Sequence, residues 1–111
     1  MTKDEKQWLN DLSEIGCILC AHLGTPGTPA EIHHPRSGVG MGRKATHFEA
    51  IPLCPEHHRG KTGVHGLGTK GFPKHYGITE QELQAKAALM IGTLRAQRTV
   101  RRPDKRNEPN G

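Results

Sequence analysis

Residues 51–60 read Ile51-Pro52-Leu53-Cys54-Pro55-Glu56-His57-His58-Arg59-Gly60, and the architecture of the chain depends on them. The apolar run before the cysteine is typical of a short buried strand, so we expect a strand over residues 50–53. From His57 onward we expect a helix or helical turn that Gly60 and Gly63 soon interrupt. The stretch therefore joins a strand to a helical turn and carries one thiol and two imidazoles at the junction.

A pair of cysteines, Cys17 and Cys20, lies upstream and has the same spacing as the pair Cys54 and His57. Two such pairs are typical of tetrahedral zinc, because two close ligands on each of two turns can surround one ion. We expect these four residues to hold a structural Zn²⁺, with His22 as an alternative to His57. Four protein ligands would leave no open position for water or substrate. A thioredoxin-like redox pair is the other interpretation, but it needs a βαβ pattern that the sequence lacks.

The composition favours a protein with a thin core. Hydrophobic residues make up 32% of the 111 positions and aromatic residues 4%, whereas Gly and Pro contribute 14 and 8. Such a core needs a further crosslink, and three cysteines would leave at least one thiol outside any intrachain disulfide. The chain begins without an apolar leader and contains no apolar run of membrane-spanning length. We therefore expect a reduced, cytoplasmic compartment and no membrane partner.

Helical periodicity predicts two helices at the ends of the domain. The first covers residues 3–15 and ends at Gly16; its apolar positions are Trp8, Leu9, Leu12 and Ile15. The second follows a capping box formed by Thr79 and Glu82. Its apolar stripe consists of Leu83, Ala87, Met90, Ile91 and Leu94.

Between these helices we expect a second short strand over residues 30–34, which Pro35 stops. A glycine-rich, basic stretch over 38–44 separates the two strands. It fits neither the GxGxxG nor the P-loop pattern, so we expect a loop rather than a nucleotide site. From Arg101 the apolar pattern ends. We expect a single domain over 1–100, with its core over 17–77, and a disordered basic tail over 101–111.

The positive charge is unevenly placed along the chain, whose net charge is +5. Residues 35–74 carry seven basic and two acidic side chains, and residues 95–111 carry six and two. Such segments suit a polyanionic partner, because Lys and Arg that neutralise phosphates release counterions. The candidates for phosphate contacts are Arg43, Lys44, Arg59 and Lys61. Each of them, like the tail, is also compatible with an ordinary solvated surface.

Eight histidines include two adjacent pairs, His33-His34 and His57-His58, on either side of the strand-loop-strand pattern. If His57 binds zinc from a first helical turn, His58 lies about 100° further round the helix and can bind a second metal. The other pair lies at a strand end, where the pleat can break. One of its imidazoles can then bind a metal while the other holds water.

These motifs resemble the HNH or ββα-metal nucleases, and among them the phage recombination-enhancement, RecA-dependent nucleases and related prophage proteins. The resemblance covers roughly residues 17–77 and becomes weaker through His65 and Phe72 to Tyr76-Gly77. It rests on Cys17-Ile18-Leu19-Cys20, Ile32-His33-His34, Gly40-Met41-Gly42-Arg43-Lys44-Ala45 and the stretch 51–60. It implies a small α+β fold, with a zinc-stapled ββα-metal (HNH or His-Me finger) core between N- and C-terminal helices.

The resemblance also implies roles for the histidines. His33 and His58 are similar to ligands of a catalytic metal, and His34 to the general base that deprotonates the attacking water. The middle HNH position, usually Asn, would fall at His47, which would orient the base. His65 could be a third ligand or a phosphate contact, since it lacks the usual one-turn spacing from His58.

The expected function is hydrolysis or nicking of DNA by an endonuclease with one divalent catalytic ion (Mg²⁺, Mn²⁺, Ni²⁺ or Zn²⁺) besides the structural Zn²⁺. A neutral imidazole suits the general base, because its ordinary pKa lies near ~6.5. The expected partners are DNA and a recombinase filament, in a bacterial or phage-infected cell. The alternatives are a non-catalytic zinc-knuckle module that binds nucleic acid or protein, and a two-zinc interaction domain.

Overall fold

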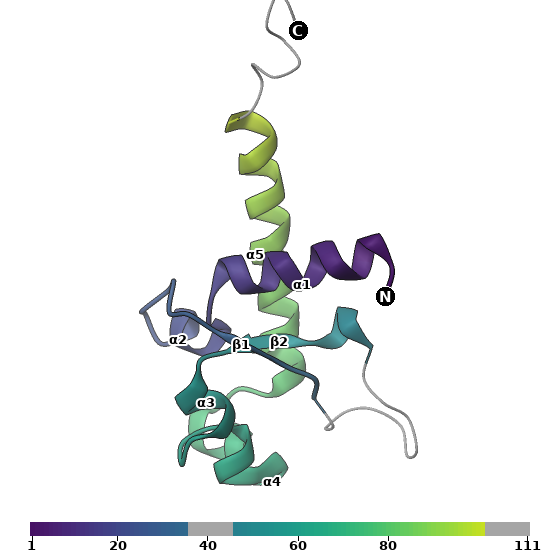
Figure 1. Ribbon diagram of the computed structural model, residues 1–111. Helices are drawn as coiled ribbons and strands as arrows, with labels where there is room; N and C mark the ends of the chain where they lie inside the picture. The colour runs from purple at the N-terminus through teal and green to yellow at the C-terminus, as the bar shows by residue number, and fades with distance from the viewer. Residues whose placement is uncertain (36–45, 102–111) are drawn as a thin grey trace, which may run out of the picture.

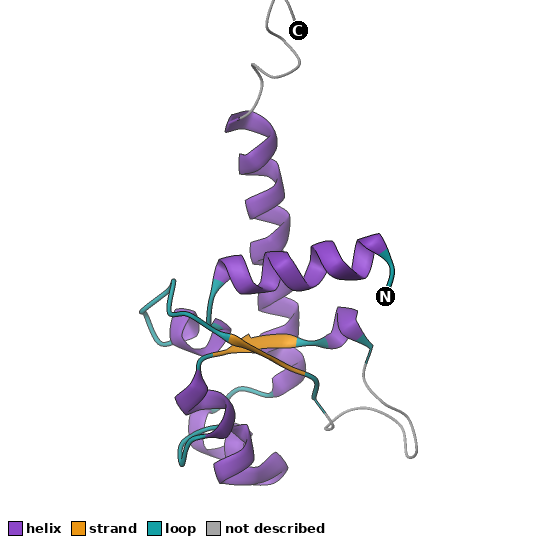
Figure 2. Ribbon diagram, in the orientation of Figure 1, coloured by secondary structure: helices purple, strands orange, loops and turns teal. Residues whose placement is uncertain are grey.

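The fold was obtained as a computed structural model that describes residues 1–35 and 46–101 (Figure 1). It is a small α+β arrangement in which helices surround a two-stranded sheet (Figure 2). In Figure 1 helix α1 crosses the long helix α5 on one side of the sheet, and α3 and α4 lie on the other side. The elements are α1 (Lys3–Ile15), α2 (Ile18–His22), β1 (Glu31–His33), the 3-10 helix η1 (His47–Glu49), β2 (Ile51–Leu53), α3 (Pro55–Arg59), α4 (Val64–Tyr76) and α5 (Glu80–Arg101).

The sheet is a single antiparallel pair, in which Glu31 lies opposite Leu53 and His33 lies opposite Ile51. Both strands are edge strands, so Pro52 is tolerated in the middle of β2. The strands expected over 30–34 and 50–53 are confirmed, although each has only three residues. His34 lies just beyond β1, so the alternation of side chains between the two faces of a strand does not fix its direction.

Helix α1 begins and ends where the sequence predicts. Thr2 and Glu5 form a reciprocal capping box, with 2.7 and 3.1 Å between donor and acceptor. Gly16 ends the helix with φ 78°, and a Cβ at this position would lie 2.7 Å from the Thr28 carbonyl oxygen. Only glycine fits both requirements. The apolar face of α1 packs into the core, where Leu12 is fully buried.

Helix α5 also starts at its predicted capping box, Thr79 and Glu82. Of its expected apolar stripe, Leu83, Ala87 and Ile91 are buried. The helix continues to Arg101, beyond the end of that stripe. Its packing therefore buries one face of its first three turns against the sheet and α1.

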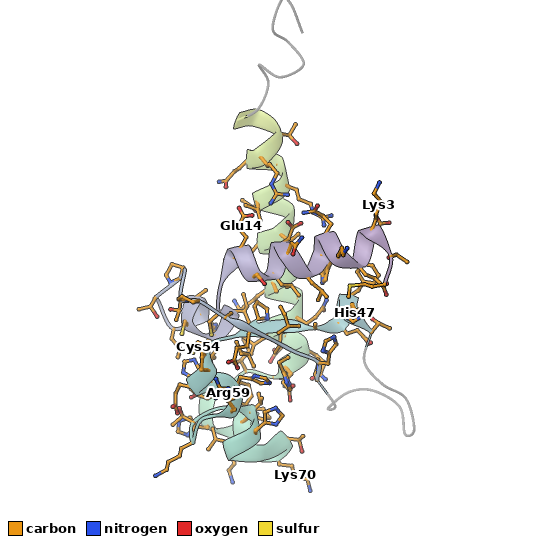
Figure 3. The ribbon with its side chains drawn as sticks, in the orientation of Figure 1. Lys3, Glu14, His47, Cys54, Arg59 and Lys70 are labelled. Carbon is orange, nitrogen blue, oxygen red and sulfur yellow. The ribbon has the colours of Figure 1, made fainter. Side chains whose placement is uncertain are left out.

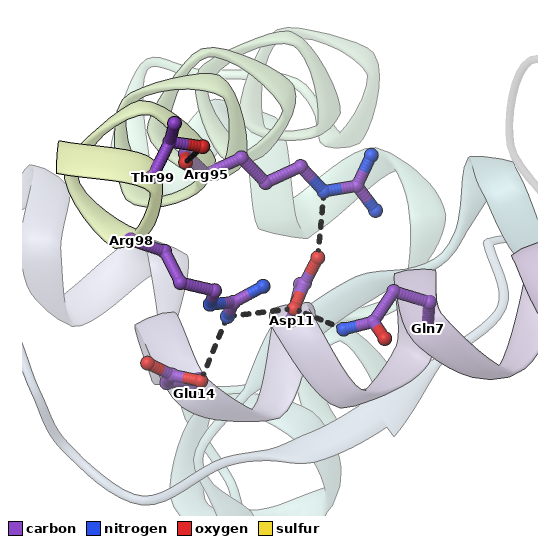
Figure 4. A network of polar contacts seen from close by, with 6 residues as sticks. All are labelled: Gln7, Asp11, Glu14, Arg95, Arg98 and Thr99. Atoms are coloured by element: carbon purple, nitrogen blue, oxygen red, sulfur yellow. Dashed lines mark hydrogen bonds and ion pairs between the residues drawn. The ribbon is translucent and has the colours of Figure 1, made fainter. Parts of the chain in front are cut away.

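A buried carboxylate, Asp11 of α1, holds the later turns of α5 (Figure 4). It accepts hydrogen bonds from Arg95 Nε at 2.8 Å, Arg98 Nη2 at 3.1 Å and Gln7 Nε2 at 2.9 Å. Arg98 Nη2 also donates to Glu14 at 3.1 Å. Burial raises the pKa of the Asp11 carboxyl, but the hydrogen bonds from Arg95, Gln7 and Arg98 outweigh burial and leave the pKa lowered. The network therefore joins the two helices through an ionised group.

Four details of the helical structure differ from the sequence predictions. Helix α3 begins at Pro55 rather than His57, since the fixed φ of proline suits a first helical position. The sequence predicted neither α2 nor η1 nor α4. Helix α4 contains a kink at Gly68 and nevertheless forms, because Val64 and Phe72 are buried in the core. Burial thus outweighs the poor helix propensity of this glycine-rich segment.

The glycine-rich stretch over 38–44, with Arg43 and Lys44, lies outside the described residues. The same holds for the expected tail except Arg101, which ends α5. Within the described ranges, no helix combines the length and the apolar character that crossing a membrane would require.

Candidate metal centres

Three cysteines and one histidine meet where α2, β2 and α3 join, and we call them the cysteine cluster: Cys17, Cys20, Cys54 and His57. Figure 3 shows Cys54 at the end of the sheet beside α3. The Sγ atoms of Cys20 and Cys54 are 3.8 Å apart. The Nδ1 atom of His57 lies 3.3, 3.5 and 3.7 Å from the Sγ atoms of Cys54, Cys20 and Cys17.

These spacings fit the edges of a zinc tetrahedron. Metal–sulfur bonds of about 2.3 Å and metal–nitrogen bonds of about 2.0–2.1 Å imply roughly 3.8 Å between sulfurs and roughly 3.6 Å between sulfur and nitrogen. All three cysteines are free thiols and buried. The cysteine cluster could therefore bind a metal such as zinc. His22, which is exposed at the end of α2, does not belong to it.

Burial shifts the pKa of two side chains in the cysteine cluster, Cys17 and His57. It raises the pKa of the Cys17 thiol to about 12, although the backbone N–H of Cys20 donates to this sulfur at 3.3 Å. Burial also lowers the pKa of His57 and so favours its neutral, ligating form. A metal would have to displace the proton of the Cys17 thiol, so its affinity would decrease as the pH is lowered.

Three imidazoles from β1, α3 and the start of α4 form a second group, the three-histidine cluster: His33, His58 and His65. Their ring centroids lie 5.1, 5.4 and 4.8 Å apart for the pairs 33/58, 33/65 and 58/65. One ligand atom from each lies within 4.8 Å of the others. His57 and His58 are neighbours in α3, yet they serve different clusters, as the rotation of a helix requires.

Carboxylates that the sequence did not single out contact two of these imidazoles. Glu80 Oε1 lies 2.8 Å from His33 Nε2, and Glu31 Oε1 lies 2.9 Å from His58 Nδ1. The residues of these pairs are 47 and 27 positions apart. One available signal was that Glu31 stands two positions before His33, which places both on the same face of a strand. Glu80 carried no such signal.

Outside the clusters, His34 and His47 share a hydrogen bond of 3.0 Å between Nε2 and Nδ1. His34 directly follows β1, and His47 opens η1 at the end of β2 remote from Cys54 (Figure 3). Burial lowers the pKa of His34, and the charges of His47 and His33 lower it further. His34 is therefore biased toward the neutral form, which can accept a proton.

Residues 1–85 match a family model described as recombination enhancement, RecA-dependent nuclease. The chain belongs to this family. A search of curated proteins found no match. The match contains both clusters, the His34–His47 pair and Glu80, and it ends within α5. The expected resemblance to RecA-dependent nucleases is confirmed, and family membership supports a nuclease role in recombination.

Two of the four phosphate contacts that the sequence predicts lie among the described residues. Arg59 is exposed, and its guanidinium binds Glu31 through Nε and Nη2 at 2.8–3.1 Å. These hydrogen bonds from Arg59, followed by that of His58, lower the pKa of the Glu31 carboxyl to about 2. Lys61 is also exposed. Arg59, a candidate for phosphate contact, thus binds the same carboxylate that contacts His58.

Proposed function

We propose that the chain is a metal-dependent HNH endonuclease that hydrolyses or nicks DNA phosphodiester bonds. The observation that carries the proposal is a juxtaposition around the end of β1. His33 enters a cluster of three imidazoles, while the next residue, His34, pairs with His47. A nuclease of this class needs one group of imidazoles for a metal and a separate imidazole for the attacking water. The same arrangement supports a ββα-metal core built from β1, β2 and α3.

In this proposal His33, His58 and His65 would hold one divalent cation. A bound cation there supplies stabilisation of the charge that develops on the phosphate and on the leaving oxygen. Three protein ligands leave open positions for substrate, unlike the four ligands of the cysteine cluster. We assign the cysteine cluster a structural Zn²⁺, because its four donors complete a tetrahedron.

His34 acts as general base and His47 orients it. If His34 carries its proton on Nε2, it donates to His47 Nδ1, and its own Nδ1 remains as the acceptor for a proton from water. The lowered pKa of His34 keeps this acceptor unprotonated near neutral pH. His47 therefore replaces the more usual Asn by fixing the ring orientation and tautomer of the base.

DNA is the proposed substrate and a recombinase filament the proposed partner, as the family description suggests. Arg59 and Lys61 would contact phosphates next to the three-histidine cluster, and Arg43 and Lys44, outside the described residues, stay candidates from the sequence alone. Their effect would be independent of sequence, since phosphate contacts position the backbone without identifying bases.

The test is cleavage of plasmid and single-stranded DNA with Mg²⁺, Mn²⁺, Ni²⁺ or Zn²⁺, with and without a RecA filament. His34→Ala should lower the cleavage rate by about 10²–10⁴-fold, the usual contribution of general base catalysis. Folding and DNA binding should stay near wild type. His75→Ala is the matched control, because His75 is exposed on α4 and belongs to neither cluster. A wild-type protein that cleaves under none of these conditions would favour the non-catalytic binding module.

A further inference from the structure

Two imidazoles of the three-histidine cluster each contact a carboxylate, but through different ring nitrogens. Glu80 contacts Nε2 of His33, whereas Glu31 contacts Nδ1 of His58. We propose that Glu80 and Glu31 are positioning residues that make a metal bind His33 through Nδ1 and His58 through Nε2. The inference deepens the proposed function, because it takes the three-histidine cluster as the metal site.

The Glu80–His33 contact is buried, with 3% and 7% of the two side chains exposed. A buried carboxylate needs a donor, and among the described residues the contact that fits is the Nε2–H of His33, at 2.8 Å. Placing the proton on Nε2 leaves the Nδ1 lone pair of His33 as its ligand atom. A ligating imidazole that donates its other N–H to a carboxylate is also a stronger base, which raises metal affinity.

The Glu31–His58 contact works in the opposite sense. Oε1 of Glu31 lies 2.9 Å from Nδ1, so the carboxylate accepts a hydrogen bond from the Nδ1–H group, and the Nε2 lone pair is left for the metal. Arg59 donates hydrogen bonds to the same carboxylate from both Nε and Nη2, which fixes the orientation of the Glu31 carboxylate.

The two carboxylates come from different elements of the fold. Glu31 and His33 lie on β1, whereas Glu80 comes from the first turn of α5. Buried Ile78 and Leu83 anchor that turn, and the Thr79–Glu82 capping box fixes where the helix begins. His33 is therefore held from the helix and His58 from the strand. Docking of α5 becomes a condition for metal affinity at a cluster to which α5 contributes no imidazole.

Glu80→Gln and Glu80→Ala test the role of the helix carboxylate, with Glu82→Gln as the matched control. Glu82→Gln removes the same charge from the same turn, but at an exposed position that only caps the helix. Isothermal titration of the zinc-loaded protein with Ni²⁺ should show 10- to 100-fold weaker binding for Glu80→Ala, the usual effect of losing such a partner. Glu80→Gln should fall in between, and Glu82→Gln should bind like wild type. Equal affinity for all four proteins would overturn the proposal.

Side-chain ¹⁵N NMR of the wild-type protein saturated with Zn²⁺ provides a readout that does not depend on any variant folding. We expect His33 to coordinate through Nδ1 and keep its Nε2 proton, and His58 to show the reverse. Coordination of both rings through the same type of nitrogen would overturn the inference even if DNA is cleaved. Mixed coordination without cleavage would leave the inference standing and contradict only the proposed function.

Discussion

The direction of each side chain decides the chemistry of the two histidine pairs. His57 and His58 follow one another in α3, yet one joins the cysteine cluster and the other the three-histidine cluster. His33 is buried in its cluster, whereas His34 is exposed and bound to His47. A rotation of about 100° per residue in a helix and the end of a strand are enough to separate these roles.

Much of the candidate site was predictable from spacing and resemblance, and the carboxylates were not. The cysteine pattern predicted the four residues of the cysteine cluster. The resemblance predicted that His33 and His58 lie close together. Glu31 and Glu80 were not predicted, because a lone acid on a strand or in a first helical turn usually faces solvent. Their contacts depend on packing between distant segments, which a sequence pattern does not express.

Removing one thiol tests the structural role of the cysteine cluster. Cys20→Ser should leave the domain unfolded at room temperature, so that heating shows no cooperative transition. The reason is that zinc binding of about 10–16 kcal/mol in such sites exceeds the usual stability of a small domain. Strong chelation should do the same to the wild type. Thermal unfolding followed by circular dichroism, with His22→Ala on the same helix as control, checks this. A Cys20→Ser protein that melts like wild type would show that the cluster is not structural.

At the level of elements, the secondary structure is too short to be stable by itself. The strands have three residues each and α2 and α3 have five, far fewer than an isolated hairpin or helix needs. Packing against the rest of the core must therefore hold these pieces, and in the proposed function a metal in the cysteine cluster adds to it. Periodicity predicted α1 and α5 because they are long and amphipathic, and it missed α2 and α4 because tertiary burial decides their conformation.

The Asp11 network should contribute measurably to the docking of α5 on α1. Asp11→Ala leaves Arg95 and Arg98 without their buried acceptor, and both arginines are partly exposed. We expect the free energy of unfolding to fall by about 2–3 kcal/mol, less than for a fully buried pair. Denaturant unfolding at fixed zinc measures it. Glu14→Gln, which removes an exposed partner of Arg98, should cost far less; equal costs would contradict the assignment.

The same network should make stability depend on pH. The pKa of Asp11 is lowered in the folded chain, so its contribution is present above the unfolded value of about 3.9 and is lost as pH falls through the lower folded value. The difference in unfolding free energy between wild type and Asp11→Asn should therefore be constant near pH 6 and shrink below about pH 4. A difference that grows on acidification would contradict the sign of this pKa shift.

For the whole molecule, the placement of basic side chains matters more for binding a polyanion than the net charge of +5. Arg95 and Arg98 belong to the basic C-terminal segment, but they bind Asp11 and Glu14 and hold the two helices together. Exposed basic side chains on the side of α3 and α4 remain for a polyanion: Lys61, Lys70 and Lys74. This is the side of the sheet that carries His58 and His65.

The single domain expected over 1–100 and the tail over 101–111 stay predictions. Deleting residues 102–111, which contain three basic and two acidic residues, should weaken DNA binding. The slope of log affinity against log salt should become shallower by about 0.9 for each phosphate that the tail no longer neutralises. Titrations at several salt concentrations test this, with melting temperature and metal content as controls. An unchanged slope would show that the tail does not bind DNA.

The proposed function requires that imidazoles from β1, α3 and α4 bind one ion, separate from the ion in the cysteine cluster. Anomalous diffraction provides the decisive test, with crystals grown in zinc and then soaked in Mn²⁺, Ni²⁺ or Zn²⁺, whichever of the three supports cleavage best. We predict two peaks, one among Cys17, Cys20, Cys54 and His57, and one among His33, His58 and His65. A peak in the cysteine cluster alone, at an ion concentration that supports cleavage, would contradict the proposed metal site.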